Sequence, residues 1–98
     1  MLVETTNYFA RPGKEAAVLA QRRHASALRA HLGLHPGEIF TKVEGAGPDV
    51  RWQCAFETQE AYEADMAARA RSPEFAEARQ SMHQLVQRFE RHLERLAP

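Results

Sequence analysis

Few side chains in this sequence could do chemistry, and the first candidate is Asn7. Residues 2–10 alternate, so Asn7 shares a face with Thr5 and Phe9, and its amide is predicted to point toward apolar neighbours beneath the helices. A buried amide without hydrogen bonds costs about 1–3 kcal/mol, so it must find partners. Two interpretations stay open: a structural amide that bonds nearby groups, and an amide that binds a ligand.

Trp52 and Phe56 are the aromatic candidates, on one face of the predicted strand 50–57 with Val50 and Cys54. Alternation here is the cleanest in the chain and predicts a half-buried strand. Core aromatics are one interpretation; the other is a flat wall for an aromatic ligand, with the indole N–H as a donor. Cys54 is expected to be an inert core thiol, because apolar surroundings disfavour its thiolate.

Arg79, Tyr62 and Met66 are candidates on the predicted helices. Arg79 lies beside an apolar stripe, and its guanidinium would bind a carboxylate or a phenolate if it leans inward. The alternative is a surface arginine whose aliphatic stem covers the stripe. Tyr62 and Met66 recur at helical spacing, which suits core residues as well as ligand contacts.

The five histidines raise the question of a metal ion or a general base. His24 and His31 are two helical turns apart, and no cysteine or paired carboxylate completes a ligand set, so no metal is expected. His24 and His83 remain candidates for a general base or a substrate contact, because imidazole titrates near neutral pH. The alternative for each is a half-exposed structural histidine.

These candidates depend on elements that hydrophobic periodicity predicts. Alternation predicts strands, and helical spacing predicts helices, with Ser72-Pro73 as a start signal. The expected elements are strand 2–10, helix 14–32, strand 38–44, strand 50–57, a helical segment from 58 and a second from 73. The end of the chain stays open, since periodicity favours a helix for 88–96 and alternation allows a terminal strand.

Length and charge limit the classes of function. The 98 residues suit one domain, 1–98. Thirteen basic and thirteen acidic residues give a formal net charge of zero, which argues against nucleic acid and membrane as partners. Arginines interspersed with glutamates predict a solvated, ion-paired surface, with Arg22 and Arg29 off the apolar arc of the first helix. The single cysteine and an N-terminus without a signal-peptide pattern predict a cytoplasmic protein.

The order of the elements predicts a ferredoxin-like α+β fold, in which an antiparallel sheet carries helices on one face. The other face is expected to mix apolar and polar side chains, namely Leu2, Tyr8, Phe40 and Ala55 among Glu4, Lys42, Arg51, Gln53 and Glu57. Mixed polarity of this kind suits a subunit interface, and a two-fold homodimer is the expected assembly.

Three segments carry a resemblance to a known superfamily. They are the opening strand with Asn7 and the following Arg11-Pro12-Gly13-Lys14-Glu15, the passage from Trp52 to Tyr62, and Ser72-Pro73-Glu74-Phe75. This layout resembles the dimeric α/β-barrel superfamily, which includes antibiotic-biosynthesis-monooxygenase-like enzymes and NIPSNAP-type proteins. The resemblance implies two subunits packed sheet to sheet, each with a pocket between its own sheet and helices.

The resemblance also implies a chemistry. Its oxygenases often need no cofactor, because an electron-rich phenolate or enolate substrate reacts with oxygen directly, and an Asn at the position of Asn7 binds the substrate or the oxygen. The haem-degrading branch has a Trp where this chain has Phe56 and its haem-ligating His near Arg79, and an arginine is no practical axial ligand, so haem is not expected.

Two hypotheses for function follow from these residues and from the resemblance. The first is a cofactor-independent, monooxygenase-like enzyme acting on an aromatic or polyketide-like compound, with Asn7, Trp52 and Arg79 as catalytic residues. Its expected substrate-binding residues are Thr5, Phe9, Phe56, Tyr62, Met66, His24 and His83. The alternative is a non-catalytic dimeric module that binds a small apolar ligand or has a structural role.

Overall fold

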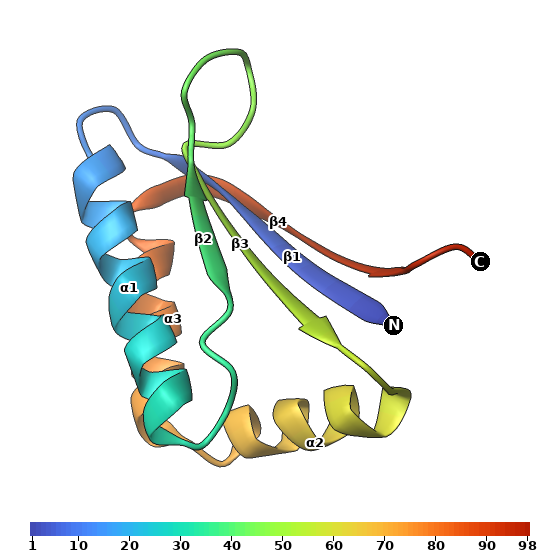
Figure 1. The fold of residues 1–98 in the computed structure, drawn as a ribbon. Helices are drawn as coiled ribbons and strands as arrows, with labels where there is room; N and C mark the ends of the chain where they lie inside the picture. The colour runs from blue at the N-terminus through green and yellow to red at the C-terminus, as the bar shows by residue number, and fades with distance from the viewer.

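A computed structural model describes all residues, 1–98, as an open four-stranded sheet with three helices on one face (Figure 1). The elements are β1 (Leu2–Ala10), α1 (Glu15–His31), β2 (Glu38–Thr41), β3 (Val50–Phe56), α2 (Gln59–Ala70), α3 (Pro73–His83) and β4 (Val86–Arg95). The strands are antiparallel in the order β2-β3-β1-β4. The predicted ferredoxin-like α+β fold is confirmed.

The end of the chain is a strand. β4 pairs with β1 along its length, with Tyr8 opposite Phe89 and Glu4 opposite Leu93. Helical periodicity in this segment favoured a helix, and that preference is wrong. Phe89 and Leu93 are four residues apart, a spacing that puts two side chains on one face of a helix and equally on one face of a strand. The free edge of β1 decides between them, because its backbone groups need hydrogen-bonding partners.

Side-chain caps set the starts of the last two helices. The Thr58 hydroxyl accepts a hydrogen bond from the Ala61 N–H at 3.1 Å, and the Ser72 hydroxyl accepts one from the Phe75 N–H at 3.1 Å. Each such cap contributes about 1 kcal/mol. The predicted start at Ser72, with Pro73 in the first turn, is confirmed.

The orientation of β1 is the opposite of the predicted one. Thr6 lies opposite Trp52 in the β1–β3 ladder, and Asn7 lies opposite Arg51. Directly opposed residues of antiparallel strands point to the same face of the sheet. Thr6 therefore faces the helices with Trp52, and Asn7 faces away from them.

This register corrects two sets of assignments. Leu2, Glu4 and Tyr8 lie beneath the helices, where they are 5%, 1% and 7% exposed, and not on the open face. Thr5 and Phe9 alternate with them and share the open face with Asn7. Both faces of β1 mix apolar and polar residues, so alternation separates the faces without saying which is buried.

The helix α1 also buries an unexpected face. Val18, Arg22, Ala25 and Arg29 follow one another at spacings of four, three and four residues, and all are buried, with Arg29 at 0% exposed. The prediction that Arg22 and Arg29 lie on a solvated surface is wrong. The spacing is that of a core stripe, but two of its members are arginines, which a search for apolar residues passes over.

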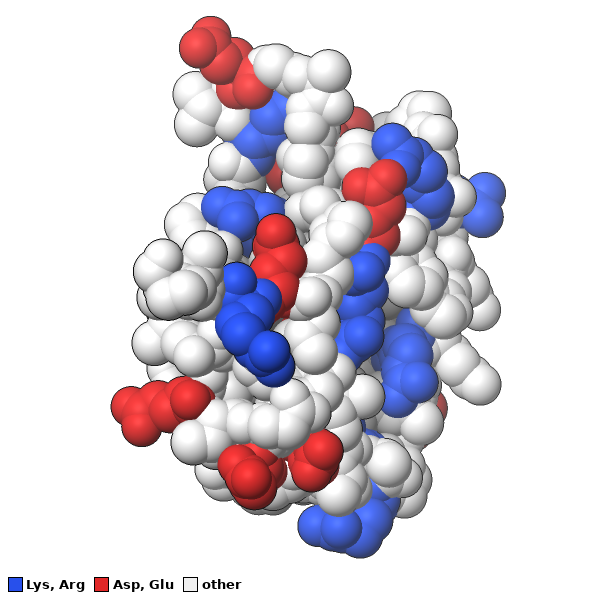
Figure 2. Space-filling view, turned by 90° about the vertical axis from the view of Figure 1, so that its right-hand side faces the viewer, with Lys and Arg blue, Asp and Glu red and all other residues white.

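The hydrophobic core lies between the sheet and the helices. Its buried members are Leu2, Tyr8, Ala10, Val18, Val50, Trp52, Cys54, Phe56, Met82 and Val86. Acidic and basic side chains are interspersed over the face seen in Figure 2, so charge is not segregated there. None of the helices combines the length and the apolar character needed to cross a bilayer.

Candidate functional site

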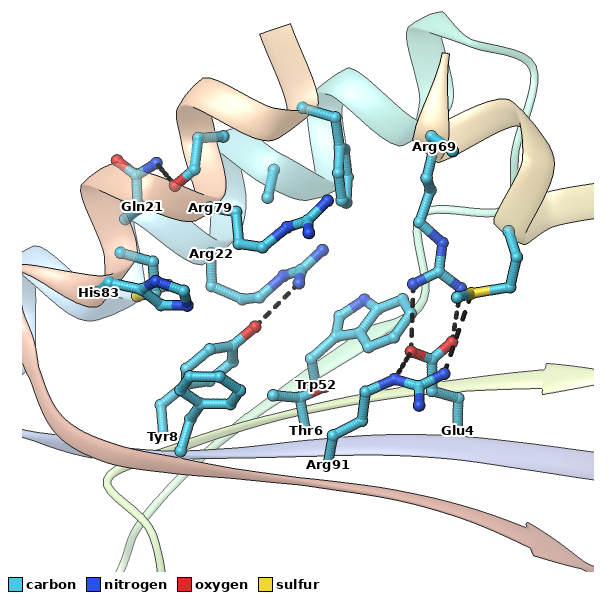
Figure 3. Close-up of a pocket in the computed structure, with 17 residues that line it drawn as sticks. Glu4, Thr6, Tyr8, Gln21, Arg22, Trp52, Arg69, Arg79, His83 and Arg91 are labelled. Carbon is cyan, nitrogen blue, oxygen red and sulfur yellow. Dashed lines mark hydrogen bonds and ion pairs between the residues drawn. The ribbon is translucent and has the colours of Figure 1, made fainter. Parts of the chain in front are cut away.

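A pocket of about 570 Å³ opens between the helix-covered face of the sheet and the helices (Figure 3). Its apolar and aromatic walls come from Trp52, Met66, Ala70, Phe75, Ala78, Met82 and Phe89. Its polar lining includes Tyr8, Gln21, Arg22, Arg79 and His83. Residues from three strands and all three helices meet here, so the tertiary fold assembles the site.

Arg22 is the central polar group of the pocket. One Nη donates to the Tyr8 hydroxyl at 3.1 Å and the other to the Ser26 hydroxyl at 3.4 Å, while Nε is buried without a partner. The guanidinium carbon lies 4.5 Å from the centre of the Trp52 ring. Burial lowers the pKa of Arg22, and the hydrogen bond with Tyr8 only partly opposes this. The positive charge of Arg22 is thus stabilised by the hydroxyl groups of Tyr8 and Ser26 and by the π face of Trp52.

Glu4 forms a separate ion-pair cluster at one end of the pocket. Its carboxylate accepts two hydrogen bonds from Arg69, at 2.6 and 3.1 Å, and a third from Nε of Arg91 at 2.9 Å. Burial alone would raise the pKa of Glu4, but the two arginines outweigh burial and hold the pKa below its usual value. The carboxylate is therefore ionised and accepts hydrogen bonds from two arginines.

Asp65 extends this cluster beneath α1. It accepts hydrogen bonds from Arg29 at 2.7 and 3.0 Å and from Nε of Arg69 at 2.7 Å. Burial would raise the pKa of Asp65, yet Arg29 and Arg69 together lower it. Arg69 thus bridges the two buried carboxylates and ties α2 to β1 through Glu4, while Asp65 ties α2 to α1 through Arg29.

Trp52 is held rigidly at the base of the pocket. Its indole N–H donates to the carbonyl of Pro36 at 2.8 Å. A Cβ at Gly37 would lie 2.3 Å from that nitrogen, so only glycine allows the close approach of this segment. The indole donor is occupied by the backbone, so Trp52 lines the pocket through its ring, over which the Arg22 guanidinium lies.

The pocket brings together some of the predicted site residues. Trp52, Arg79, Met66 and His83 line it. The remaining predicted contacts do not, as Phe56 and Tyr62 pack on each other with ring centroids 5.3 Å apart and His24 is exposed on α1. Buried Cys54 has a raised pKa because burial disfavours its thiolate.

Asn7 does not converge with Trp52 and Arg79. It lies on the open face of the sheet with Thr5 and Phe9, and none of the three lines the pocket. The expectation that Asn7 points beneath the helices is wrong. Its Oδ1 atom is buried nonetheless and accepts no hydrogen bond within the chain.

Sequence reasoning missed the residues that give the pocket its polar character. Tyr8 was assigned to the open face, and Arg22 to the surface. The four–three–four spacing of the α1 stripe was the available signal for Arg22, had arginine been admitted as a core residue.

The fold is similar to those of several solved protein structures. An uncharacterised NIPSNAP domain protein from Burkholderia xenovorans superposes with a TM-score of 0.77 at 17% identity, covering 99% of this chain and 95% of that one. An antibiotic biosynthesis monooxygenase superposes with a TM-score of 0.74 at 14% identity, covering 100% of both chains. No family model and no curated protein matches this sequence.

A third solved structure is described as a dimeric protein of unknown function with a ferredoxin-like fold, from Bacteroides fragilis. It superposes with a TM-score of 0.71 at 14% identity, covering 97% of this chain and 95% of that one. The resemblance predicted from the sequence layout is thus confirmed at the level of the fold. Identities this low carry the fold alone.

Proposed function

We propose that this protein binds a small aromatic or polyketide-like compound in the pocket and works as a homodimer. The pocket itself carries the proposal. Its volume of about 570 Å³ lies within the usual range of small-molecule sites, roughly 300–1,000 Å³. Aromatic and apolar walls with a few converging polar groups are the usual lining of such sites.

Binding is testable without knowing the natural compound. Trp52 is the only tryptophan of the chain and lines the pocket, so its fluorescence reports occupancy. We expect a panel of two- and three-ring aromatic compounds to change that fluorescence and to raise the melting temperature by mass action. A well-folded protein that responds to no member of the panel would contradict the proposal.

The homodimer is supported by the open face of the sheet. Phe40 is 42% exposed there, and the buried Oδ1 of Asn7 lacks a hydrogen-bond donor. The structural neighbour from Bacteroides fragilis is described as dimeric. We therefore place the two-fold interface on this face. The cytoplasmic location expected from the single cysteine stays a prediction.

A second candidate function is a cofactor-independent oxygenase, favoured by the fold shared with an antibiotic biosynthesis monooxygenase. In the simplest such reaction, a methylene between aromatic rings becomes a ketone. Two C–H bonds break, one atom of O₂ forms the C=O bond, and the other leaves as water with the two hydrogens. The substrate supplies the electrons.

His83 and Arg79 are the pocket residues suited to this reaction. The His83 imidazole can accept the methylene proton as a general base, and the Arg79 guanidinium can stabilise the resulting enolate. We expect oxygen uptake with anthrones, reduced at least tenfold in His83→Asn. Exposed His24→Asn is the matched control. Binding without oxygen uptake would leave the non-catalytic module as the function.

A further inference from the structure

The arginines around the pocket differ in whether they have a carboxylate partner. Arg29, Arg69 and Arg91 each pair with Asp65 or Glu4 at 2.6–2.9 Å. Arg22 takes part in none of the ion pairs of the chain, although it is only 5% exposed. A buried charge is normally paired, because a charged group that moves out of water without an opposite charge nearby loses a large solvation free energy.

No side chain within the pocket can supply the missing partner. Glu4 is the only acidic residue in the lining, and its two oxygens are occupied by Arg69 and Arg91. Hydroxyl groups of Tyr8 and Ser26 are the only hydrogen-bond acceptors of Arg22. They solvate the guanidinium without neutralising it.

A second cation faces the same space. Arg79, an exposed residue of α3, also lines the pocket and takes part in no ion pair, and Figure 3 shows its side chain over the same cavity as that of Arg22. Four arginines and one glutamate line the pocket, in a chain whose formal net charge is zero. Positive charge is therefore concentrated in this cavity.

We propose that the ligand is an organic anion: a flat aromatic body bearing an oxyanion, either a carboxylate or an ionised enol or phenol, that pairs with Arg22 and Arg79. The ring system fills the space between Trp52, Phe75 and Met82, and the oxyanion faces the two guanidinium groups. This inference rests on the proposed function, and it adds the charge and position of the ligand.

A matched pair of probes tests the charge. 2-Naphthoate and 2-naphthamide have the same ring system and nearly the same shape, and only the first is an anion at neutral pH. In a low-chloride buffer we expect the unmodified protein to bind 2-naphthoate about tenfold or more tightly than 2-naphthamide, by calorimetry. Both should move the single indole N–H cross-peak of Trp52 in an NMR spectrum.

Two variants locate the charge. Arg22→Gln should abolish the preference for 2-naphthoate, and Arg22→Lys should keep part of it. Arg23→Gln, on the exposed face of the same helix, is the matched control and should keep all of it. The comparison of the two probes in the unmodified protein needs no variant, so it tests the charge of the ligand even if Arg22→Gln does not fold.

The outcomes separate this inference from the proposed function. Equal affinities for the two probes, with both moving the Trp52 cross-peak, would overturn the anion inference and leave the pocket as a binding site. An undiminished preference in folded Arg22→Gln, or binding of 2-naphthoate that leaves the cross-peak in place, would also overturn it. If neither probe binds at millimolar concentration, both proposals are contradicted.

Discussion

The Arg22 guanidinium stacks on the ring of Trp52, 4.5 Å from its centre, and Arg29 approaches the same ring at 4.9 Å. The two arginines belong to one stripe of α1 and share one aromatic partner. They differ in that Arg29 also pairs with Asp65 at 2.7 Å, whereas Arg22 has no carboxylate. Arg29 therefore stabilises the fold through an ion pair, whereas the positive charge of Arg22 has no carboxylate partner and faces the pocket.

This difference predicts unequal effects on stability. Arg29→Met should lower the free energy of unfolding by about 3–5 kcal/mol, because it removes a hydrogen-bonding partner of buried Asp65. Arg22→Met should cost at least about 2 kcal/mol less, because no carboxylate loses its partner. Urea denaturation of both variants measures the difference. Equal losses would mean that Arg22 is as structural as Arg29.

The buried carboxylates predict a loss of stability in acid. The pKa values of Glu4 and Asp65 are lower in the folded chain than their ordinary values of 4.5 and 3.8. Folded groups with lowered pKa values contribute stability at pH above the unfolded values and lose it as pH falls through the folded ones. The free energy of unfolding should therefore fall below about pH 4.5.

Glu4→Gln tests the origin of this acid sensitivity. The variant should be less stable at pH 7 and should lose less further stability between pH 4.5 and pH 2, since it lacks one titrating group. Exposed Glu63→Gln is the control and should follow the unmodified protein. Parallel curves for Glu4→Gln and the unmodified protein would assign the acid sensitivity to other groups.

Gly37 and Gly33 offer a matched test of the close contact at Trp52. Both have positive φ values, +78° and +81°, so alanine is strained at either position. A Cβ at Gly33 meets nothing within 4 Å, whereas one at Gly37 lies 2.3 Å from the indole nitrogen. We expect Gly37→Ala to destabilise the protein by roughly 1–3 kcal/mol more than Gly33→Ala.

Gly37→Ala and Gly33→Ala also test whether the position of Trp52 depends on Gly37. Because displacement of the indole would break its hydrogen bond to Pro36, Gly37→Ala should shift the Trp52 fluorescence spectrum and Gly33→Ala should not. Denaturation with fluorescence detection measures both quantities. Identical behaviour of the two variants would rule out a rigid contact between Gly37 and Trp52.

The proposed homodimer predicts a solution mass twice the 11.1 kDa of the chain. Light scattering coupled to gel filtration measures this mass over a range of concentrations. Phe40→Asp places a charge on the open face and should shift the protein toward the monomer. Val43→Asp, at a position 95% exposed in the loop after β2, should not. A monomer at all concentrations would refute the sheet-to-sheet assembly.

Local signals predicted much of the fold from the sequence. The alternation of β3 placed Trp52 and Cys54 inward, and both are buried at 1% and 0% exposed. The start signal at Ser72 separated α3 from α2, because a cap and a proline act within a few residues. Such signals depend on neighbours in the chain, so the sequence alone contains them.

The candidate site was predicted only in part, because its members meet through the sheet register. Trp52 and Arg79 both line the pocket, whereas Asn7 and Tyr8 lie on the faces of β1 opposite to the predicted ones. Alternation along β1 is equally strong for either orientation. A shift of one residue moves every side chain to the other face, and only pairing with β3 and β4 selects one.

The sequence by itself determined the order of the elements as far as α3, the cap at Ser72 and the inward face of β3, because these depend on residues close together in the chain. Tertiary structure decided that 86–95 is a strand, that Glu4 and Tyr8 face the helices, and that Arg22 is buried without a carboxylate. The physical reason is that backbone pairing and burial of charge depend on partners up to 87 residues away, as for Glu4 and Arg91.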